Sequence, residues 1–505
     1  MDISLDRASS TPLYLQLRNQ LREMILSGSL PPGYRLPPER KLAETLEVNR
    51  STVISAYREL ESAGLVRSHV GRGTSVTYLP SSDAAARPVQ PGAISWRQSF
   101  SEASMRMRDP LLRDILELAN RKDVISFAAG MSSPELMPVE EFNQVTQQVM
   151  KEYGRQLYLY GSTEGCYPLR ESLSRLTESR GIACSPEEVL ILTGSQQGLE
   201  LAARALLSPG DAVVVEEPSF FCALQIFRAA GARVLGVPVD EGGMRVDMLE
   251  PLLARYQPKF IYTLTTFQNP SGTVLELERR KTLLDLAYRY QVPILEDDPY
   301  GELYYEGRGP RPLKSMDQSG YVIYLSTISK MLFPGLRVGW MAAPRPVVQQ
   351  FAMVKQLIDL HTNNLAQMSV DMFLRQGRLW PHLDRLRSEY AKHRDTMLRA
   401  LERHAPPGVE WNRPEGGFYI WCRLPSSLNS NKLLIRASDR GVSFVPGEPF
   451  FSGGMGRNCL RLNFTYPSRE SIEQGIAVLM EVIREARLEA DAALDRLETG
   501  LRPLV

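Results

Sequence analysis

Apolar residues in the first 80 positions recur first with helical spacing and then with strand spacing. Thr11 and the proline after it are typical of the start of a helix. Apolar residues then recur every three or four positions and predict a helix that ends at Gly28. Two shorter helices are predicted after Pro38 and after the capping residue Asn49. Positions 66–78 alternate apolar and polar residues around a glycine-rich turn, which predicts a β-hairpin. Three helices and a hairpin in this order predict a winged helix-turn-helix, a small α+β head.

A different pattern runs from about Leu111 to the end of the chain. Helical periodicity alternates there with short, continuous apolar runs, which are typical of buried parallel strands. This alternation predicts an α/β domain built on a mostly parallel sheet. The runs that predict strands are 189–192, 212–215, 260–262, 293–295 and 321–324.

Between the two patterns lies a stretch without apolar periodicity. Three prolines and Gly92 interrupt any helix or strand there, and proline stiffens an extended linker. We therefore expect three parts, namely a head at 1–79, a linker at 80–110 and an α/β domain at 111–505.

Composition narrows the class of protein. The 505 residues include 59 Lys and Arg against 58 Asp and Glu, so DNA binding would have to come from a local surface. No apolar run is long enough to span a membrane, and the N-terminus lacks the basic and apolar regions of a secretory signal. The five Cys contain no C-x-x-C pair and the five His no H-x-x-x-H pair, which predicts a cytoplasmic protein without a metal site.

The third helix of the head carries candidate DNA contacts at its start. Arg50, Ser51 and Thr52 open this helix, where a recognition helix meets bases and phosphates. Arg40 lies on the preceding helix, and Arg72 lies at the hairpin tip. The local excess of basic over acidic residues is small, so charge alone is equally explained by an ordinary solvated face.

Four motifs in the head resemble the GntR-type winged-helix DNA-binding domain. They are Gly33-Tyr-Arg-Leu-Pro-Pro-Glu-Arg-Lys-Leu-Ala43, Val48-Asn-Arg-Ser-Thr-Val53, Glu61-Ser-Ala-Gly-Leu-Val66 and Gly71-Arg-Gly-Thr74. The resemblance covers residues 10–78 and implies binding to double-stranded DNA. The DNA-contacting positions that it implies are Arg40, Arg50, Ser51, Thr52, Arg72 and Gly73.

Polar loops follow several predicted strands, at the edge of a parallel sheet where ligands bind. Thr193-Gly-Ser-Gln-Gln-Gly198 precedes a helix and offers N–H groups to a phosphate, although such a motif by itself is more often an ordinary helix cap. Asn269-Pro-Ser-Gly272 and Glu296-Asp-Asp-Pro-Tyr300 are by themselves plain turns. Together with Ser329-Lys330 and Arg337, they supply the lysine, carboxylate and phosphate cup that a pyridine aldehyde cofactor requires.

The order and spacing of these loops resemble fold type I aminotransferases, particularly the kynurenine/α-aminoadipate branch. Asn269 and Asp297 are 28 residues apart, Asp297 and Lys330 are 33 apart, and Lys330 and Arg337 are 7 apart. The resemblance runs from about Leu111 to Arg487 and implies pyridoxal 5'-phosphate (PLP) as the cofactor. It also implies a large, mostly parallel sheet lobe and a small lobe.

The same resemblance implies a role for each residue around the cofactor. Lys330, the catalytic lysine, would form the internal aldimine with PLP, and Asp297 would pair with its pyridinium nitrogen. Asn269 and Tyr300 would hydrogen-bond the ring oxygen, and Phe220 would stack on the ring. The residues implied to hold the phosphate are Ser195, Gln196, Thr327, Ser329 and Arg337.

Three further features complete the implied pocket. Tyr160 matches the tyrosine that reaches the phosphate from the partner subunit of a homodimer. Arg461 matches the arginine that clamps the carboxylate of a substrate or effector through a bidentate pair. Gly416-Gly-Phe-Tyr419 resembles the glycine-rich strand that closes the ligand pocket.

A GntR-type head joined to an aminotransferase-like domain resembles the MocR (GabR-type) regulators over nearly the whole chain. That family resemblance implies a dimeric, PLP-dependent transcriptional regulator. Its large domain would sense PLP, or an amino acid or amine effector bound as an aldimine, and shift the population that reads DNA.

Two other functions fit the same residues. The chain could be a working aminotransferase with an incidental head, since Lys330, Asp297, Tyr300 and Arg461 are all present; turnover with a keto-acid acceptor would identify it. It could instead be a DNA-binding repressor whose large domain only dimerises, which predicts no spectral response to PLP. We rank the regulator first, the enzyme second and the dimeriser third.

Overall fold

The two sequence patterns fold as separate units, Met1–Ser99 and Phe100–Val505, in the computed structural model. The structure describes residue 3 and residues 5–6, 12–26, 29–62, 64–69, 73–77, 99–101, 104–105 and 123–500. Most of the linker predicted at 80–110 therefore lies outside the described residues, as does Arg72.

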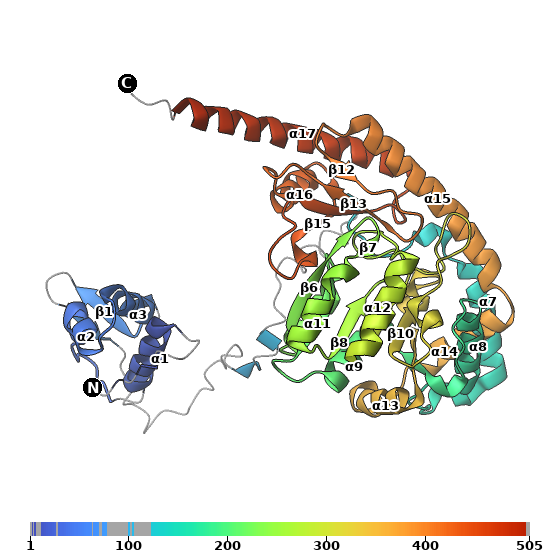
Figure 1. The fold of residues 1–505 in the computed structure, drawn as a ribbon, viewed down its shortest axis with the longest axis horizontal. Coiled ribbons are helices and arrows are strands. Elements are labelled where there is room, and N and C mark those ends of the chain that lie inside the picture. The colour runs from blue at the N-terminus through green and yellow to red at the C-terminus, as the bar shows by residue number, and fades with distance from the viewer. Residues whose placement is uncertain are drawn as a thin grey trace. The chain divides into compact units, whose positions relative to one another are not determined.

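The head consists of three helices and a two-stranded sheet (Figure 1). Its elements are α1 (Leu13–Leu26), α2 (Glu39–Thr45), α3 (Arg50–Ser62), β1 (Val66–His69) and β2 (Gly73–Val76). The apolar positions that predicted α1 and α3, among them Leu17, Leu21 and Val53, form one buried core. The two strands pair antiparallel, with Val66 opposite Val76. The predicted winged helix-turn-helix is confirmed.

The second unit is built on an eight-stranded sheet in the order β4-β11-β10-β9-β8-β5-β6-β7. The strands are β4 (Val189–Leu192), β5 (Ala212–Glu217), β6 (Arg233–Asp240), β7 (Gly243–Met244), β8 (Phe260–Thr263), β9 (Ile294–Asp297), β10 (Val322–Thr327) and β11 (Gly339–Ala342). The neighbours from β10 across to β6 are parallel, whereas β11 runs antiparallel to both β10 and β4. The sheet is thus mostly parallel, as predicted.

Helices cover both faces of this sheet (Figure 1). In β5, Val213 and Val215 pack with helices on one face, while Val214 packs with helices on the other. The continuous apolar runs exist because a parallel strand covered on both faces buries every residue. The helices of this unit are α7 (Val139–Tyr153), α8 (Tyr167–Glu178), α9 (Ser195–Leu206), α10 (Phe221–Ala229), α11 (Glu250–Tyr256), α12 (Leu277–Tyr290), α13 (Arg345–Asp359), α14 (Asn364–Arg375), α15 (Leu379–His404), α16 (Ser430–Asp439) and α17 (Arg469–Gly500).

A smaller lobe carries a second sheet, in the order β12-β13-β16-β15. Its strands are β12 (Glu410–Trp411), β13 (Tyr419–Arg423), β15 (Val445–Pro446) and β16 (Cys459–Asn463), and its paired neighbours are antiparallel. A short parallel pair, β3 (Ile125–Ser126) with β14 (Val442–Ser443), ties the start of this unit to the small lobe. Across the described residues, no helix is long and apolar enough to cross a membrane.

Candidate functional site

The carboxyl ends of β9 and β10 bring two of the predicted residues into one region. The strands are parallel neighbours, with Asp297 opposite Leu325. Asp297 ends β9, and Lys330 ends a short 3₁₀ helix, Ile328–Lys330, that directly follows β10. The ends of parallel strands meet at one edge of a sheet, so residues 33 positions apart in sequence reach the same pocket.

Asp297 is buried and keeps one carboxylate oxygen without a partner. Its Oδ2 accepts a hydrogen bond of 3.0 Å from the Tyr262 hydroxyl, and its Oδ1 has no hydrogen-bond partner within the described chain. Burial raises the pKa of Asp297 to about 7, and the neighbouring Asp298 adds to that rise. The Tyr262 hydrogen bond and Lys330 act in the opposite direction. A buried carboxylate oxygen of this kind favours a cationic N–H as its partner.

The Lys330 amine lies between polar and aromatic groups. Its Nζ donates to the Gly130 carbonyl oxygen and lies 5.8 Å from the centroid of the Phe418 ring. Burial lowers the pKa of Lys330, and the positive charges of Arg461 and Arg337 lower it further. Tyr419 and Asp297 oppose this change. A lowered pKa leaves more of the amine neutral, the form that attacks a carbonyl carbon.

A turn before α9 and the guanidinium of Arg337 form a compact cationic corner. Gly194 precedes α9 with φ of 85°, and a Cβ there would lie 2.3 Å from Nη2 of Arg337. The Arg337 Nη2 donates to the Thr193 carbonyl oxygen at 3.3 Å, and its Nη1 donates to Ser329 Oγ at 3.4 Å. Only glycine fits at position 194, because any side chain would displace the guanidinium.

The remaining predicted phosphate ligands surround this corner. Thr327 donates from Oγ1 to Ser329 Oγ at 2.9 Å and accepts from the Ser329 N–H at 3.1 Å. Ser195 and Gln196 are the first two residues of α9, where backbone N–H groups have no intrahelical acceptor. Gln196 is exposed.

Arg461, on β16, brings the small lobe to the same pocket. Its Nη1 donates to Asn269 Oδ1 at 2.9 Å and its Nη2 donates to the Ala128 carbonyl oxygen at 3.2 Å. Its Nε is buried without a hydrogen-bond partner in the described chain. The guanidinium carbon lies 4.0 Å from the centroid of the Tyr419 ring, and the Tyr300 hydroxyl donates to the Tyr419 hydroxyl at 3.3 Å. Asn269 is therefore hydrogen-bonded directly to Arg461, and Tyr300 is linked to Arg461 through the side chain of Tyr419.

Two predicted residues lie away from this group of contacts. Tyr160 is 87% exposed, and its ring lies 6.0 Å from the ring of His361. Phe220 is half-buried at the start of α10, with its ring 5.4 Å from that of Phe221. The Phe221 ring in turn contacts Phe450, and the Phe450 ring lies 5.3 Å from the guanidinium of Arg461.

Sequence reasoning missed several members of the pocket. Tyr262 lies inside an apolar run that predicts a buried strand, so the sequence indicated a core residue and no role for its hydroxyl. Gly130 contributes only a carbonyl oxygen, which no side-chain pattern reports. Phe450 ends a short 3₁₀ helix, Glu448–Phe450, and its only signal in the sequence was the aromatic pair that it forms with the residue after it.

In the head, the predicted DNA contacts Arg40, Arg50 and Ser51 are exposed, and the two arginines are paired with acids. The Asn49 side chain accepts from both the N–H and the hydroxyl of Ser51, at 3.0 and 2.9 Å, and so orders the start of α3. Arg50 Nη2 lies 3.2 Å from Glu39 Oε2, and Arg40 lies 3.6 Å from Glu44.

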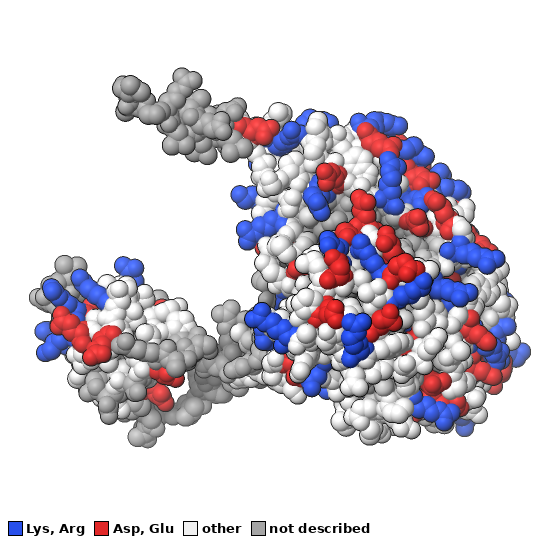
Figure 2. Space-filling view, in the orientation of Figure 1, with Lys and Arg blue, Asp and Glu red and all other residues white. Residues whose placement is uncertain are grey.

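The remaining predicted contacts of the head lie at the start of α3 and beside the hairpin turn. Thr52 is half-buried, and Gly73 is exposed with φ of 80°. Figure 2 shows acidic side chains beside the basic ones on the head. The surface is therefore locally mixed in charge, and its exposed basic side chains are the groups that can reach a polyanion.

Both units of the chain match known protein families. Residues 13–76 match the bacterial regulatory proteins of the gntR family, and residues 122–479 match aminotransferase class I and II. The chain is 34% identical to the uncharacterized HTH-type transcriptional regulator YisV of Bacillus subtilis, over 95% of this chain and 97% of that protein. It is 30% identical to the probable rhizopine catabolism regulatory protein MocR of Rhizobium meliloti, over 99% of each. The chain belongs to the MocR-type regulators of the GntR family.

The large domain of this MocR-type regulator also resembles working aminotransferases. LysN, the α-aminoadipate aminotransferase of Thermus thermophilus, was solved in complex with N-(5'-phosphopyridoxyl)-L-leucine. That structure is 38% identical and superposes with a TM-score of 0.74, covering 78% of this chain and 100% of LysN. The fold is that of fold type I aminotransferases, and the cofactor of such a domain is PLP.

The pocket of this MocR-type regulator fits PLP on its own geometry. Among the described residues, Oδ1 of Asp297 is a free acceptor for a pyridine N–H, and burial lowers the pKa of the Lys330 amine. The corner between Gly194 and Arg337 has no room for a side chain at position 194. It is rich in hydrogen-bond donors, which a phosphate requires. When bound, PLP supplies an aldehyde for an amine and an electron-withdrawing ring.

Proposed function

We propose that this chain is a homodimeric transcriptional regulator in which PLP, or a carboxylate-bearing amine that reacts with it, controls how the head reads DNA. The observation that carries this proposal is the unpartnered, buried Oδ1 of Asp297 next to a lysine of lowered pKa, in a chain that also carries a GntR head. A head alone would not need such a pocket, and an enzyme would not need the head.

Within this proposal, each side chain of the pocket has one task. Lys330 binds the cofactor covalently, and Asp297 accepts the pyridine N–H. Tyr300 and Asn269 donate to the ring oxygen, and Phe220 packs against the ring. The phosphate is held by Ser195, Gln196, Thr327, Ser329 and Arg337.

The effector class follows from Arg461. Its guanidinium is held from two sides by Asn269 and the Ala128 carbonyl and lies on the Tyr419 ring, so little freedom is lost when a carboxylate binds. A planar guanidinium recognises a carboxylate through paired hydrogen bonds. We therefore expect an amino acid or another amine with a carboxylate.

Coupling of the effector to DNA requires only differential binding. An effector at 100 times its Kd stabilises the state that it binds by about 2.7 kcal/mol. That free energy shifts the ratio of two conformations by about 100-fold. The sign of the effect on DNA occupancy follows from which conformation holds the effector better.

The proposed homodimer accounts for the exposure of Tyr160. Tyr158, Leu159, Tyr160, Leu357 and Leu360 are all at least 49% exposed. The two segments that carry them lie side by side, because the Tyr160 ring lies 6.0 Å from the ring of His361, the residue after Leu360. Exposed apolar patches of this kind mark protein interfaces, and a second copy would place Tyr160 at its partner's phosphate corner.

The decisive experiment measures DNA binding and cofactor binding on the same samples. Fluorescence anisotropy on DNA from upstream of its own gene, with and without PLP, is recorded for the wild type, Lys330→Ala and the control Lys392→Ala. Lys392 is an exposed lysine on α15 paired with Glu389. We expect salt-sensitive binding that exceeds binding to random DNA and responds to PLP in the wild type and the control only.

Two results would redirect the proposal. A response of DNA binding to PLP that persists in Lys330→Ala would show that covalent binding through Lys330 does not control the head. No spectral response to PLP at all would leave a dimeriser that carries a DNA-binding head. Binding no stronger than to random DNA would exclude regulation at this promoter region.

Transaminase activity is the second candidate function, favoured by the 38% identity to LysN. Every side chain expected for full turnover is present: Lys330, Asp297, Tyr300 and Arg461. Repeated turnover with a keto-acid acceptor would support an enzyme. Conversion of the cofactor spectrum that stops after one equivalent of amine would support a sensor.

The shared site can be tested with mixed dimers. Tyr160→Ala and Lys330→Ala chains each lack one part of the proposed site. In a heterodimer, one pocket regains both Lys330 and the Tyr160 of its partner. We expect mixing to restore tight PLP binding to about half of the pockets of the heterodimer, and no gain on mixing would refute the exchange of Tyr160 between subunits.

A further inference from the structure

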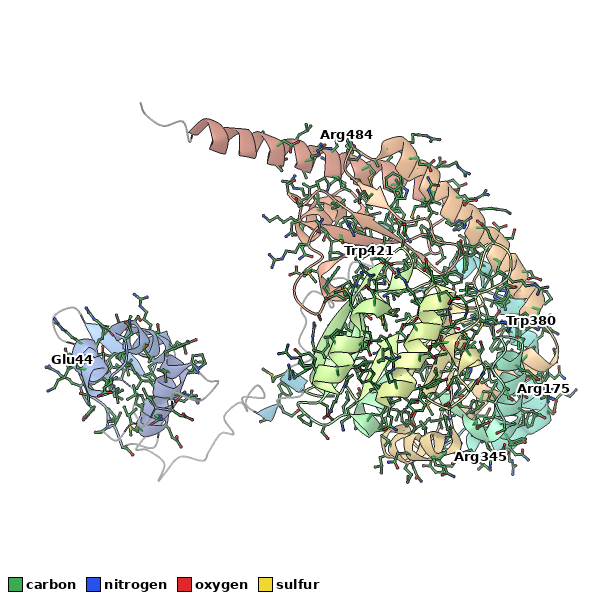
Figure 3. All side chains as sticks on the ribbon, viewed as in Figure 1. Glu44, Arg175, Arg345, Trp380, Trp421 and Arg484 are labelled. Carbon is green, nitrogen blue, oxygen red and sulfur yellow. The ribbon has the colours of Figure 1, made fainter. Side chains whose placement is uncertain are left out.

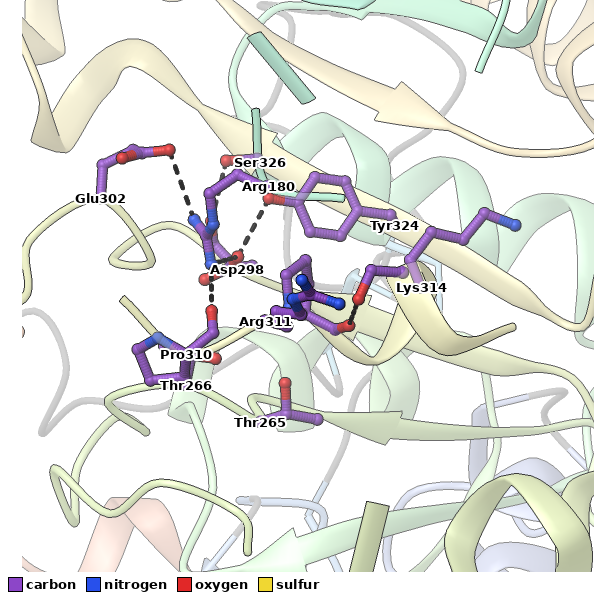
Figure 4. A network of polar contacts seen from close by, with 12 residues as sticks. Arg180, Thr265, Thr266, Asp298, Glu302, Pro310, Arg311, Lys314, Tyr324 and Ser326 are labelled. Carbon is purple, nitrogen blue, oxygen red and sulfur yellow. Dashed lines mark hydrogen bonds and ion pairs between the residues drawn. The ribbon is translucent and has the colours of Figure 1, made fainter. Parts of the chain in front are cut away.

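A buried charged cluster surrounds Asp298, the residue that follows β9 (Figure 4). Asp298, the residue after Asp297, is 1% exposed, and the Arg180 guanidinium after α8 is its counter-ion at 3.2 Å. The Tyr324 hydroxyl donates to the same carboxylate oxygen, Oδ2, at 3.0 Å. We call Asp298, Arg180, Tyr324 and Glu302 the Asp298 cluster.

The backbone of Asp298 is anchored as firmly as its side chain. Its N–H donates to the Leu325 carbonyl oxygen at 2.8 Å, and its own carbonyl oxygen accepts from Ser326 Oγ at 2.8 Å. Both partners lie on β10, the strand that leads to Lys330. The cluster therefore joins the two strand ends that carry Asp297 and Lys330.

Arg180 is itself fixed by several groups. Its guanidinium donates to the Pro310 carbonyl oxygen at 2.9 Å and lies 3.6 Å from Glu302, which is also paired with Arg387 of α15 at 3.1 Å. A Cβ on Gly301 would lie 2.1 Å from Arg180 Nη1, so the loop is shaped around this side chain. A cation held this closely compensates a buried carboxylate that would otherwise be strongly unfavourable.

One oxygen of Asp298 and one donor of Trp340 have no hydrogen-bond partner among the described residues. They are Oδ1 of Asp298 and Nε1 of Trp340, and both residues are at most 2% exposed. Both residues line one small cavity that leaves about 10 Å³ for the centre of a water molecule. That space admits a single water, which bonds to buried polar groups of this kind.

We propose that Asp298 is a positioning residue for Asp297, held by Arg180, Tyr324 and one buried water that bridges it to Trp340. Successive side chains of an extended strand point to opposite faces, so a carboxylate anchored behind the sheet edge fixes its neighbour in front of it. The positive charge of Arg180 also weakens the repulsion between these two adjacent buried carboxylates. This inference rests on the proposed function, in which Asp297 accepts the pyridine N–H.

A second-site rescue tests the electrostatic part in full-length protein. Arg180→Met leaves the Asp298 charge buried and unpaired, and we expect PLP affinity to fall by about 30-fold with a shifted visible absorbance and circular dichroism of the bound cofactor. Asp298→Asn in the Arg180→Met background removes that charge, and we expect the affinity to return to within about threefold of the wild type.

The matched control is Arg175→Met. Arg175 lies at the outer surface of α8 (Figure 3), 61% exposed and paired with Glu171, and its loss should leave the PLP spectrum unchanged. If the double variant binds PLP no better than Arg180→Met, Arg180 serves only packing and the inference is wrong. If Arg180→Met does not fold while the double variant folds and binds PLP, the same conclusion about charge compensation is reached.

The water and the underlying role of Asp297 need separate measurements. A crystal structure of the PLP-bound protein should place one water within hydrogen-bonding distance of both Trp340 Nε1 and Asp298 Oδ1; a protein acceptor for Trp340, or an empty site, would refute the bridge. Asp297→Asn measures the proposed function itself. If it keeps normal PLP affinity the proposed function fails, whereas a loss in Asp297→Asn without one in Arg180→Met refutes only the positioning role.

Discussion

The two ligand-binding regions of this chain handle charge in opposite ways. In the head, Arg40 and Arg50 are 85% and 63% exposed and are paired only with surface acids. In the pocket, Asp297 and Arg461 are at most 3% exposed, and each keeps a polar atom without a partner among the residues that the structure describes. A polyanion is bound by solvated charges that exchange their partners for phosphates. A small ligand is bound by groups that are already desolvated before it arrives.

This contrast has an energetic consequence. Surface pairs such as Arg50–Glu39 contribute little to folding, so losing one costs about 0–1 kcal/mol. Buried groups without a partner destabilise the ligand-free fold and recover that free energy only on binding. Changes in the pocket should therefore alter both ligand affinity and stability, and changes in the head should alter DNA affinity alone.

The largest effect is expected from Asp297→Asn. Loss of the charged acceptor should weaken PLP binding by about 100-fold, the size of one charge-assisted hydrogen bond. Absorbance titration of PLP measures this, with the exposed Asp285→Asn on α12 as control. Equal affinities in the wild type and Asp297→Asn would contradict the contrast drawn above.

The same variant should stabilise the ligand-free protein at alkaline pH. The pKa of Asp297 is about 7 in the folded chain against 3.8 ordinarily, so the folded state binds the proton more tightly. Stability from this group is therefore full below about pH 4 and falls as pH rises to about 7, by up to about 4 kcal/mol. We expect a higher Tm for ligand-free Asp297→Asn at pH 8 and nearly equal values at pH 4; a lower Tm at pH 8 would reverse the sign of the argument.

A smaller loss, about 30-fold, is expected for a carboxylate ligand in Arg461→Lys, because a lysine cannot form the paired contact. L-leucine and isoamylamine differ by the carboxylate, and each is titrated against the PLP spectrum. Leucine should lose affinity while isoamylamine changes by less than about twofold. The control is Arg423→Lys, an exposed residue of β13, and an equal loss for both amines would show that Arg461 acts on something other than the carboxylate.

In the head, Arg50→Ala should lower DNA affinity by about 10-fold and reduce the salt dependence by about one phosphate contact. Its PLP spectrum and its Tm should match the wild type within error. Anisotropy over a range of salt concentrations measures this. The control Arg345→Ala removes an exposed arginine of α13 that is 3.5 Å from Glu187 (Figure 3), and an unchanged salt slope in Arg50→Ala would exclude a phosphate contact.

The smallest effect is expected from Glu39→Gln, which frees Arg50 from its surface partner. DNA affinity should rise about two- to threefold at low salt and be unchanged at high salt, where such pairs are screened. Lower affinity in this variant would mean that Glu39 positions Arg50 rather than competing for it.

Much of the site could be predicted because the cofactor loops keep a fixed order along the chain. Each of Asn269, Asp297 and Lys330 follows a buried strand run, and parallel strands bring their ends together without further information. The antiparallel strand β11 was not predicted, since its four residues, Gly339–Ala342, follow the Arg337 loop too closely to stand out. Tyr262 and the Gly130 carbonyl were missed because neither carries a local pattern.

The sequence by itself determined the two periodicities, the order of the polar loops, the helices and hairpin of the head, and five strands of the larger unit. Only the tertiary structure decided which distant groups meet, such as Arg461 with Asn269 across 192 positions and Asp298 with Arg180 across the sheet edge. The physical reason is that local spacing sets which face of an element a side chain occupies, whereas the partner it meets depends on how whole elements pack. The unpartnered atoms of Asp297 and Arg461, which point to a ligand, exist only in that packing.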